Sequence, residues 1–575
     1  MPVRAALLIV LPLVFLGPLT AQDRRDVEDF EFVVKTVAEE GAAIRRHRID
    51  WNGVAKTYRT RLEGVKDEAG LVALVMELLA ECRDGHTGVL RHGVDRAKLP
   101  SKWDGLWSAG LWVVQEGGRF QLAGRDQEKG ARPGATWVTV GGWPVHLAME
   151  RERRRCARIQ GLSSSHSFFA SIGNRAVPMG EAESIELGFL VDGEVETEPV
   201  RRWGPTGRGF DSMSVDGPEG LARKDGAVGY VLSGEGAARI GYLRITGSMD
   251  EATAKAFHAA MDELGAIGAL VLDCRGMGGG GDGPAWDVAG RFFAKPVGNG
   301  RNGRIEPTGS KPFLGPVLMI QDELEVSSAE TFTWAMSETG RAISIGRPTG
   351  GWSIIPRRFR APSGRFDFRV GVTDRPTPIR GILTEGTGWA PDLLVPRGPV
   401  LTRNARFTLE LATGLAALAL AEGEDATRDL VRRLGEGRFD EIRQKRKRAR
   451  SAAGAPDLVP LVEALEADLT ATLDLETALL ERCDPPDVLG ARARLEEIRP
   501  RAREAGAKRA LTALERKLKG LAGEARAQEA LLEALDARFS WSERERASFL
   551  KAHGRSAHAD FARKNLPGKD DASGR

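Results

Sequence analysis

The sequence predicts an α/β protein in which a parallel sheet covered by helices is flanked by helical segments and a small β domain. Three observations predict this class. Strand and helix patterns alternate over residues 228–400, apolar residues recur at helical spacing in residues 26–98 and after residue 401, and short strand-like runs separated by glycine-rich turns occupy residues 105–203. Alternating strands and helices are typical of a parallel sheet with helices on its faces.

An N-terminal helical segment is expected over residues 22–100 and a small β domain over residues 105–203. In the first, one-sided apolar spacing leads into Asp84-Gly85-His86-Thr87, where Gly85 is a helix stop signal. In the second, two strand-like runs are joined by Asp192-Gly193, a dipeptide typical of two-residue hairpin turns. The first is therefore expected to be a small helical bundle and the second a small β domain.

The core is expected over residues 204–400 and a C-terminal helical region over residues 401–575. Core strands are predicted at 240–245, 269–273, 317–321 and 342–345, and core helices at 251–264 and 328–339. The C-terminal region is rich in Ala, Leu, Glu and Arg, which favours a helical hairpin or bundle. Its basic run, residues 445–450, is interpreted as a solvated helix face, with binding of an anionic patch as the alternative.

Composition excludes several classes of protein. The 575 residues suffice for roughly three to four domains, and 83 Lys and Arg against 80 Asp and Glu leave a formal net charge of +3. This balance argues against a dedicated nucleic-acid binder. The 69 glycines follow no Gly-X-Y period, which excludes collagen. A disulfide scaffold and a zinc ribbon are excluded because the four cysteines are far apart and form no CxxC pair: Cys82, Cys156, Cys274 and Cys483.

Residues 1–21 are predicted to be a secretory signal peptide. Arg4 precedes an apolar run over residues 5–16, and small residues near Ala21 suit cleavage. The alternative is an uncleaved membrane anchor, but the run is shorter than the ~20 residues of a membrane span and contains Pro12. We therefore expect an exported protein, periplasmic or extracellular, without stable membrane insertion after cleavage.

Two loops of the predicted core could carry chemistry. Residues 276–281 are a glycine-rich run between a strand and a helix, which could cradle phosphate or offer backbone N–H groups to an oxyanion. Ser327 lies at another strand-to-helix corner, near the positive end of a helix dipole and beside the N–H of Ser328. The alternative is a simple helix N-cap, because Ser327 and Glu330 have the spacing of a capping box.

A nucleophilic serine needs a base, and the sequence restricts the choice. No lysine occurs between Lys311 and Lys445, which leaves the eight histidines as candidates. His86 directly follows a glycine at the end of a buried helix and is flanked by Asp84 and Thr87. A histidine in such a place is more often structural than catalytic, so spacing alone leaves both readings of His86 open.

The predicted core resembles the tail-specific (C-terminal processing) serine peptidases and their tricorn-core relatives. The matching motifs occur in the order of that family, at residues 240–245, 271–276, 327–330, 346–351 and 385–392. Of these, 271–276 and the glycines after it resemble its LDxRxNxGG loop, and 385–392 resemble its EGxGxxPD motif. Residues 84–87 resemble the DGHT of the histidine-using branch, and the β domain is similar to the PDZ-like module of these proteins.

This resemblance implies a crotonase-like α/β core and an exported serine endopeptidase. Ser327 would be the nucleophile, His86 the base and Glu385 the group that orients the imidazole. The oxyanion would be held by backbone N–H groups of Ser328 and of one glycine among Gly278, Gly279 and Gly280. Neither a metal nor another cofactor is implied. The implied substrate is a polypeptide C-terminus or an unfolded chain, which the PDZ-like module would capture by strand addition.

Three positions depart from the family pattern. One branch of the family has a lysine base 25 residues after its serine, and Trp352 stands there, which excludes that branch. Gly85 stands where the tricorn core has a serine, and Met277 where an asparagine is usual in the glycine loop. The alternative function is accordingly a catalytically silent binding or scaffold module built on the same core.

Overall fold

The computed structural model describes residues 21–101, 106–108, 111–116, 119–125, 135–173, 177–178, 182–201, 204–205, 226–233, 235, 238–298, 303–404, 406–449, 457–535 and 541–566. The predicted signal peptide, except for its last residue, lies outside this part of the chain. Among the described residues, no helix is both long enough and apolar enough to span a membrane.

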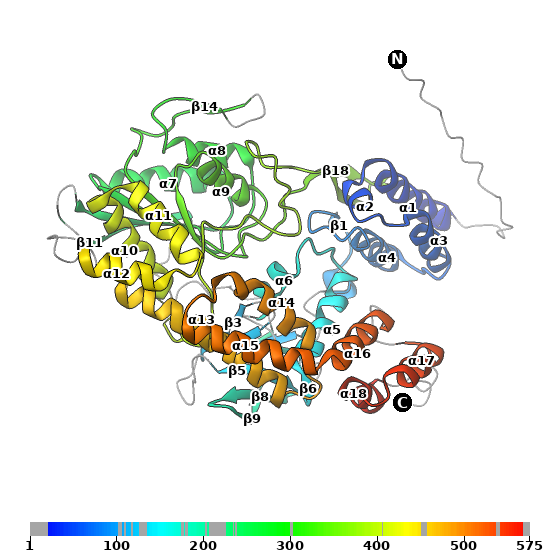
Figure 1. The fold of residues 1–575 in the computed structure, drawn as a ribbon. Coiled ribbons are helices and arrows are strands. Elements are labelled where there is room, and N and C mark those ends of the chain that lie inside the picture. The colour runs from blue at the N-terminus through cyan, green and yellow to red at the C-terminus, as the bar shows by residue number, and fades with distance from the viewer. Residues whose placement is uncertain are drawn as a thin grey trace, which may run out of the picture.

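The core is a six-stranded sheet in the order β11-β12-β13-β16-β17-β20 (Figure 1). Its strands are Gly226–Ser233, Ile240–Thr246, Ala269–Asp273, Val317–Gln321, Ile343–Gly346 and Leu393–Leu394. β11 is antiparallel to β12, and all other neighbours are parallel. The four strands predicted for the core are β12, β13, β16 and β17. Because parallel strands end at one edge of the sheet, the loops after β13, β16 and β17 gather there.

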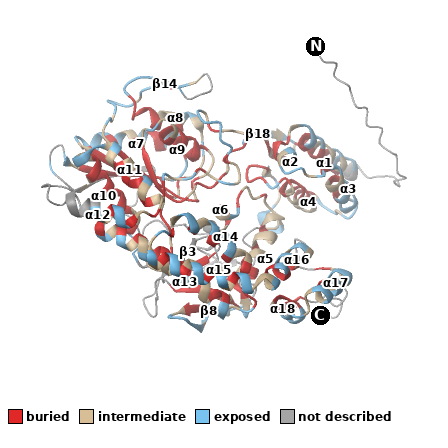
Figure 2. Cartoon of the chain, in the orientation of Figure 1, coloured by how far each residue is buried: buried red, intermediate tan, exposed pale blue. Residues whose placement is uncertain are grey.

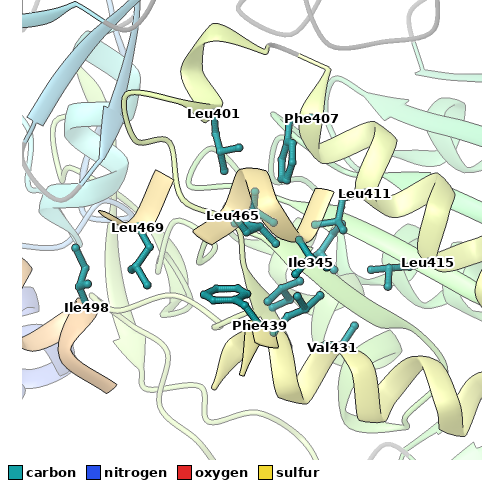
Figure 3. Packing of buried hydrophobic residues seen from close by; sticks show 14 of the residues in the cluster. Ile345, Leu401, Phe407, Leu411, Leu415, Val431, Phe439, Leu465, Leu469 and Ile498 are labelled. Atoms are coloured by element: carbon teal, nitrogen blue, oxygen red, sulfur yellow. The ribbon is translucent and has the colours of Figure 1, made fainter. Parts of the chain in front are cut away.

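Helices cover both faces of this sheet. One face carries α7 (Glu251–Leu264), α8 (Asp282–Gly290) and α9 (Ser328–Glu338). The other carries α10 (Phe407–Glu422) and α11 (Glu424–Gly435). Side chains of β13 alternate between the faces, since Leu270 and Leu272 join the first apolar cluster and Val271 joins the second. Figure 3 shows the second cluster, where Ile345 of the sheet lies among Leu411, Leu415 and Phe439.

The N-terminal helices share a core with a second, smaller sheet. They are α1 (Ala21–Glu40), α2 (Ala42–Arg46), α3 (Trp51–Leu62) and α4 (Glu68–Ala80). The sheet has the order β1-β19-β18, from Gly88–His92, Phe366–Thr373 and Ile355–Arg360. Phe366, Phe368 and Val370 of β19 are buried against the helices. The segment that carries His86 is therefore tied by strand pairing to residues that follow Ser327 by about 40 positions.

The β domain is an antiparallel sheet with two helices. Its strands, in the order β3-β4-β5-β8-β9, are Leu111–Glu116, Arg119–Arg125, Thr136–Val140, Ser184–Val191 and Glu194–Arg201. The helices are α5 (Val145–Ala157) and α6 (Ser165–Gly173). β8 and β9 form the predicted hairpin, and both turn residues have positive φ, 48° at Asp192 and 87° at Gly193.

The C-terminal helices connect the core with the β domain. Beyond α11 they are α12 (Phe439–Ala449), α13 (Val459–Arg482), α14 (Val488–Ile498), α15 (Ala505–Gly520), α16 (Ala522–Ala534), α17 (Glu543–His553) and α18 (Ala557–Asn565). α13 to α15 join the apolar cluster under the core sheet, whereas α16 to α18 pack against Leu147 of α5. Figure 2 shows buried and exposed residues alternating along α13 and α15. The side chains of the basic run 445–450 lie outside the described residues.

Candidate active site

Ser327 lies on a strained turn between β16 and α9. Its φ of 60° and ψ of −123° are unusual for a residue with a side chain and cost about 1–3 kcal/mol. Its N–H is shared between the carbonyl of Trp352, at 3.1 Å, and Oε2 of Glu330, at 3.2 Å. Ser327 is thus the N-cap of α9, as the alternative reading predicted. Its Oγ nevertheless lies 3.1 Å from Nε2 of His86.

Glu330 binds the loop after β17 to this turn through hydrogen bonds. Its fully buried carboxylate also accepts hydrogen bonds from Thr349 Oγ1 at 2.6 Å, from Gly351 N at 3.0 Å and from Trp352 N at 2.8 Å. Burial raises the pKa of Glu330 to about 7. The sequence indicated Glu330 only as half of a capping box. The structure adds that the loop after β17 is attached to Ser327 through the same side chain.

His86 is held by its backbone and by burial. Its N–H donates to Oδ1 of Asp84 at 2.8 Å, and Oδ2 of Asp84 accepts from Thr87 Oγ1 at 2.6 Å. The residue is 5% exposed, and burial, with a contribution from the positive charge of Arg369, lowers the pKa of His86 to about 4. Its Nδ1 is buried and makes no hydrogen bond to any described residue. The imidazole is therefore neutral near pH 7, as a base for Ser327 must be.

Glu385 lies in the same buried region but contacts other partners. Its Oε2 accepts hydrogen bonds from the N–H groups of Ser353 at 2.5 Å and Ile354 at 2.9 Å. Its Oε1 makes no hydrogen bond to any described residue and lies 3.9 Å from Nη1 of Arg46. Burial raises the pKa of Glu385, and the nearby charge of Asp84 raises it further. Within the described chain, no hydrogen bond joins Glu385 to His86.

The glycine loop lies against the nucleophile turn. A Cβ on Gly279 would stand 2.5 Å from Cβ of Ser327, so only glycine permits this approach. The N–H of Gly278 already donates to the carbonyl of Gly247 at 2.7 Å, so Gly278 is unavailable for an oxyanion and its predicted role is corrected. The N–H groups of Gly279, Gly280 and Ser328 make no hydrogen bond within the described residues.

The β domain supplies supports that the sequence did not reveal. The hydroxyl of Ser163 accepts from the N–H of Gly85 at 2.9 Å. The hydroxyl of Ser164 donates to the carbonyl of Gly350 at 2.6 Å, and Nε2 of His166 donates to the carbonyl of Thr349 at 2.8 Å. Nothing in the polar run 163–167 pointed to this role, because each partner is distant in sequence. In the described part of the chain, no group of three or more potential ligands is placed to hold a metal ion.

A neutral imidazole beside a serine hydroxyl, on a strained turn with free backbone N–H groups nearby, is the arrangement of a serine-type hydrolase. Residues 239–395 match the family model described as Peptidase family S41. Residues 239–395 therefore form a peptidase domain of family S41, a family of serine-type peptidases. The resemblance noted in the sequence is confirmed.

Three solved structures match this chain, and the fold of one of them, mature CPAF, is similar. Mature CPAF has a TM-score of 0.51 and 12% identity, over 70% of this chain and 99% of that chain. The photosystem II D1 C-terminal processing protease has a TM-score of 0.39 and 19% identity, over 66% of this chain and 94% of that chain. The tricorn protease has a TM-score of 0.38 and 14% identity, over 69% of this chain and 37% of that chain.

Proposed function

We propose that this protein is an exported serine endopeptidase that cleaves polypeptides, with Ser327 as nucleophile and His86 as base. One observation carries the proposal. Nε2 of His86 lies 3.1 Å from Oγ of Ser327, although the two residues are 241 positions apart. Ser327 Oγ attacks the peptide carbonyl while His86 accepts its proton, and His86 then returns the proton to the leaving amine. In the second half of the reaction, a water molecule attacks the acyl-enzyme while His86 accepts its proton, and His86 then returns the proton to Oγ of Ser327.

The developing oxyanion is held by the N–H of Ser328 and the N–H of Gly279 or Gly280, which have no competing partner among the described residues. Each such donor contributes about 3 kcal/mol to the stability of the transition state. Closeness to the nucleophile supports Gly279, because a Cβ added to it would stand 2.5 Å from Cβ of Ser327. The proposed site therefore uses backbone groups from two loops at one edge of the sheet.

Glu385 completes the proposal as the orienting carboxylate. His86 Nδ1 and Glu385 Oε1 are both buried and both lack a hydrogen-bond partner among the described residues. When Nε2 accepts the serine proton, Nδ1 carries a hydrogen and needs an acceptor, which Oε1 offers. Catalytic hydrogen bonds are often loose before substrate binds, so we propose that this pair closes in the substrate complex.

We further propose a crotonase-like core, a PDZ-like β domain, and an unfolded chain or polypeptide C-terminus as substrate. The parallel order of the core strands and the antiparallel sheet of the β domain are compatible with these assignments. The signal-like residues 1–21 support export. The competing function is a catalytically silent binding module. It is favoured by the absence of a hydrogen-bond partner for His86 Nδ1 among the described residues, because a catalytic histidine needs an orienting acceptor there.

A fluorophosphonate probe separates the two functions. If the site is active, the probe modifies a single peptide of the protein, the one that contains Ser327. This labelling disappears in Ser327→Ala. The full-length protein should also degrade an unfolded, fluorescently labelled protein. Absence of both labelling and degradation in a folded sample would favour the silent module.

The pH dependence of kcat/KM tests the base. Because the folded-state pKa of His86 is lowered to about 4, the neutral base persists to acidic pH, and kcat/KM should rise through about pH 4–5 and level by pH 6. The same shift affects the free energy of unfolding. It is unaffected by His86 above the unfolded-state pKa of ~6.5, and it decreases as the pH falls from there toward 4, because the unfolded chain then binds a proton that the folded protein does not. Circular dichroism at each pH separates unfolding from titration. A rate still increasing above about pH 9 would exclude His86 as the base.

A further inference from the structure

Trp352 contacts both the proposed nucleophile and the proposed base. Its N–H donates to Oε2 of Glu330 at 2.8 Å, and its carbonyl accepts from the N–H of Ser327 at 3.1 Å. Its indole contacts the imidazole of His86 edge-on, with ring centroids 6.1 Å apart and planes at 75°. Trp352 is therefore joined to Ser327 by its backbone and to His86 by its side chain.

Gly85 makes room for this indole. A Cβ at position 85 would lie 2.8 Å from both Cδ2 and Cε3 of Trp352 and 3.0 Å from Cε2. All three nearest atoms belong to Trp352, and Gly85 is not among the described residues with positive φ. The backbone conformation at this position would thus accept alanine, and the nearest atoms that an added Cβ would meet are those of the indole.

The imidazole depends on packing for its orientation. A histidine ring is usually oriented by a hydrogen bond on its second nitrogen, but Nδ1 of His86 has no partner among the described residues. The remaining constraints are the approach of Nε2 to Ser327 and the buried surroundings, of which the indole is a part. A ring that rotates or admits water would lose its alignment with Ser327.

We propose that Trp352 is a positioning residue which, seated on Gly85, holds the His86 imidazole toward Ser327 and shields it from water. This inference rests on the proposed roles of Ser327 and His86. It joins two departures from the family pattern into one feature. The indole at position 352 lies against the glycine at position 85, so a larger residue at position 85 would collide with it.

A double-mutant cycle tests the pairing. Gly85→Ala should lower kcat about 10- to 100-fold with KM within about twofold, because small misplacements of a catalytic group cost up to about 10²-fold. In a Trp352→Ala background, Gly85→Ala should change kcat less than about twofold, because the clash has gone. Gly88→Ala is the matched control, since a Cβ there meets nothing within 4 Å and activity should be unchanged. Equal effects of Gly85→Ala in both backgrounds would overturn the proposal.

The pKa of His86 gives a readout that does not depend on turnover. In a Ser327→Ala background, NMR of ¹³C-labelled histidine should show the His86 pKa moving from about 4 toward ~6.5 when Trp352→Ala is added. An unmoved pKa would overturn the shielding role. A moved pKa in a protein that no probe labels would support the positioning role and contradict the proposed function. If Trp352→Ala does not fold, Trp352→Phe allows both measurements with smaller expected changes.

Discussion

Ser327→Ala is expected to lower kcat/KM by about 10⁴-fold or more while the protein keeps its fold. The hydroxyl is the bond-forming group of the proposed reaction, and the variant removes its contact with His86 and its part in the capping box of α9. The strained backbone at φ 60° remains, so the free energy of unfolding should change by no more than about 1.5 kcal/mol. Turnover of an unfolded protein substrate, together with thermal denaturation, measures both quantities.

The adjacent serine is a matched control. Ser328 is buried, and its Oγ has no hydrogen-bond partner among the described residues. Ser328→Ala keeps the backbone N–H that is proposed to hold the oxyanion and removes an unpaired hydroxyl. Activity should stay within a few-fold of the parent, and stability should be unchanged or slightly higher. Equal losses in the two variants would remove Ser327 from the role of nucleophile.

Among the variants considered, Arg119→Ala should cause the largest decrease in the free energy of unfolding. Arg119 of β4 is buried between Glu476 of α13, at 2.5 Å, and Asp487, also at 2.5 Å, so it joins the β domain to the C-terminal helices. Its charge contributes to the lowered pKa of Asp487. Without the guanidinium, the fully buried carboxylate of Glu476 loses its partner, which costs about 3–5 kcal/mol. Asp487 keeps hydrogen bonds from the N–H of Gly490 and the side-chain amide of Gln528. Chemical denaturation of the full-length chain measures this loss.

An exposed ion pair between the same two regions is the control. Arg482 of α13 lies 2.9 Å from Glu194 of β9, with side chains 46% and 71% exposed. Water already solvates both charges, so Arg482→Ala should cost less than about 1 kcal/mol. Arg119→Ala should also reduce activity, because Ser163 and Ser164 of the β domain contact the catalytic loops. A loss no greater than that of Arg482→Ala would show that the buried pair does not secure this interface.

Some parts of the fold could be predicted because their signals are local. The run 269–273, which is apolar at its first four positions, forms β13 as expected, since a strand buried on both faces needs apolar residues along most of its length. The Asp192-Gly193 hairpin was predicted because its turn needs two residues with positive φ. The corner at Ser327 was predicted from local signals too, because its strand, its helix and the Ser-x-x-Glu spacing all lie between residues 317 and 338.

Other features depend on contacts between distant segments. Gly278 appeared equivalent to Gly279 and Gly280, but a hydrogen bond to Gly247 occupies its N–H. Glu385 was assigned to His86 by resemblance, whereas its Oε1 faces Arg46 of the N-terminal helices. Gly85 appeared to be a helix stop, but α4 already ends at Ala80, and an added Cβ at position 85 would instead meet the indole of Trp352.

By itself, the sequence determined the order of strands and helices, the family of the core and the turn that presents Ser327, because each follows from side chains close together in the chain. The tertiary structure decided which histidine faces that serine and which backbone N–H groups stay free. Residues 84–87 reach the nucleophile turn through the pairing of β1 with β19 and through the β domain, where Ser163 accepts a hydrogen bond from Gly85 and Ser164 donates one to Gly350. Such pairings are set by burial and hydrogen bonding between segments hundreds of residues apart, which no local pattern records.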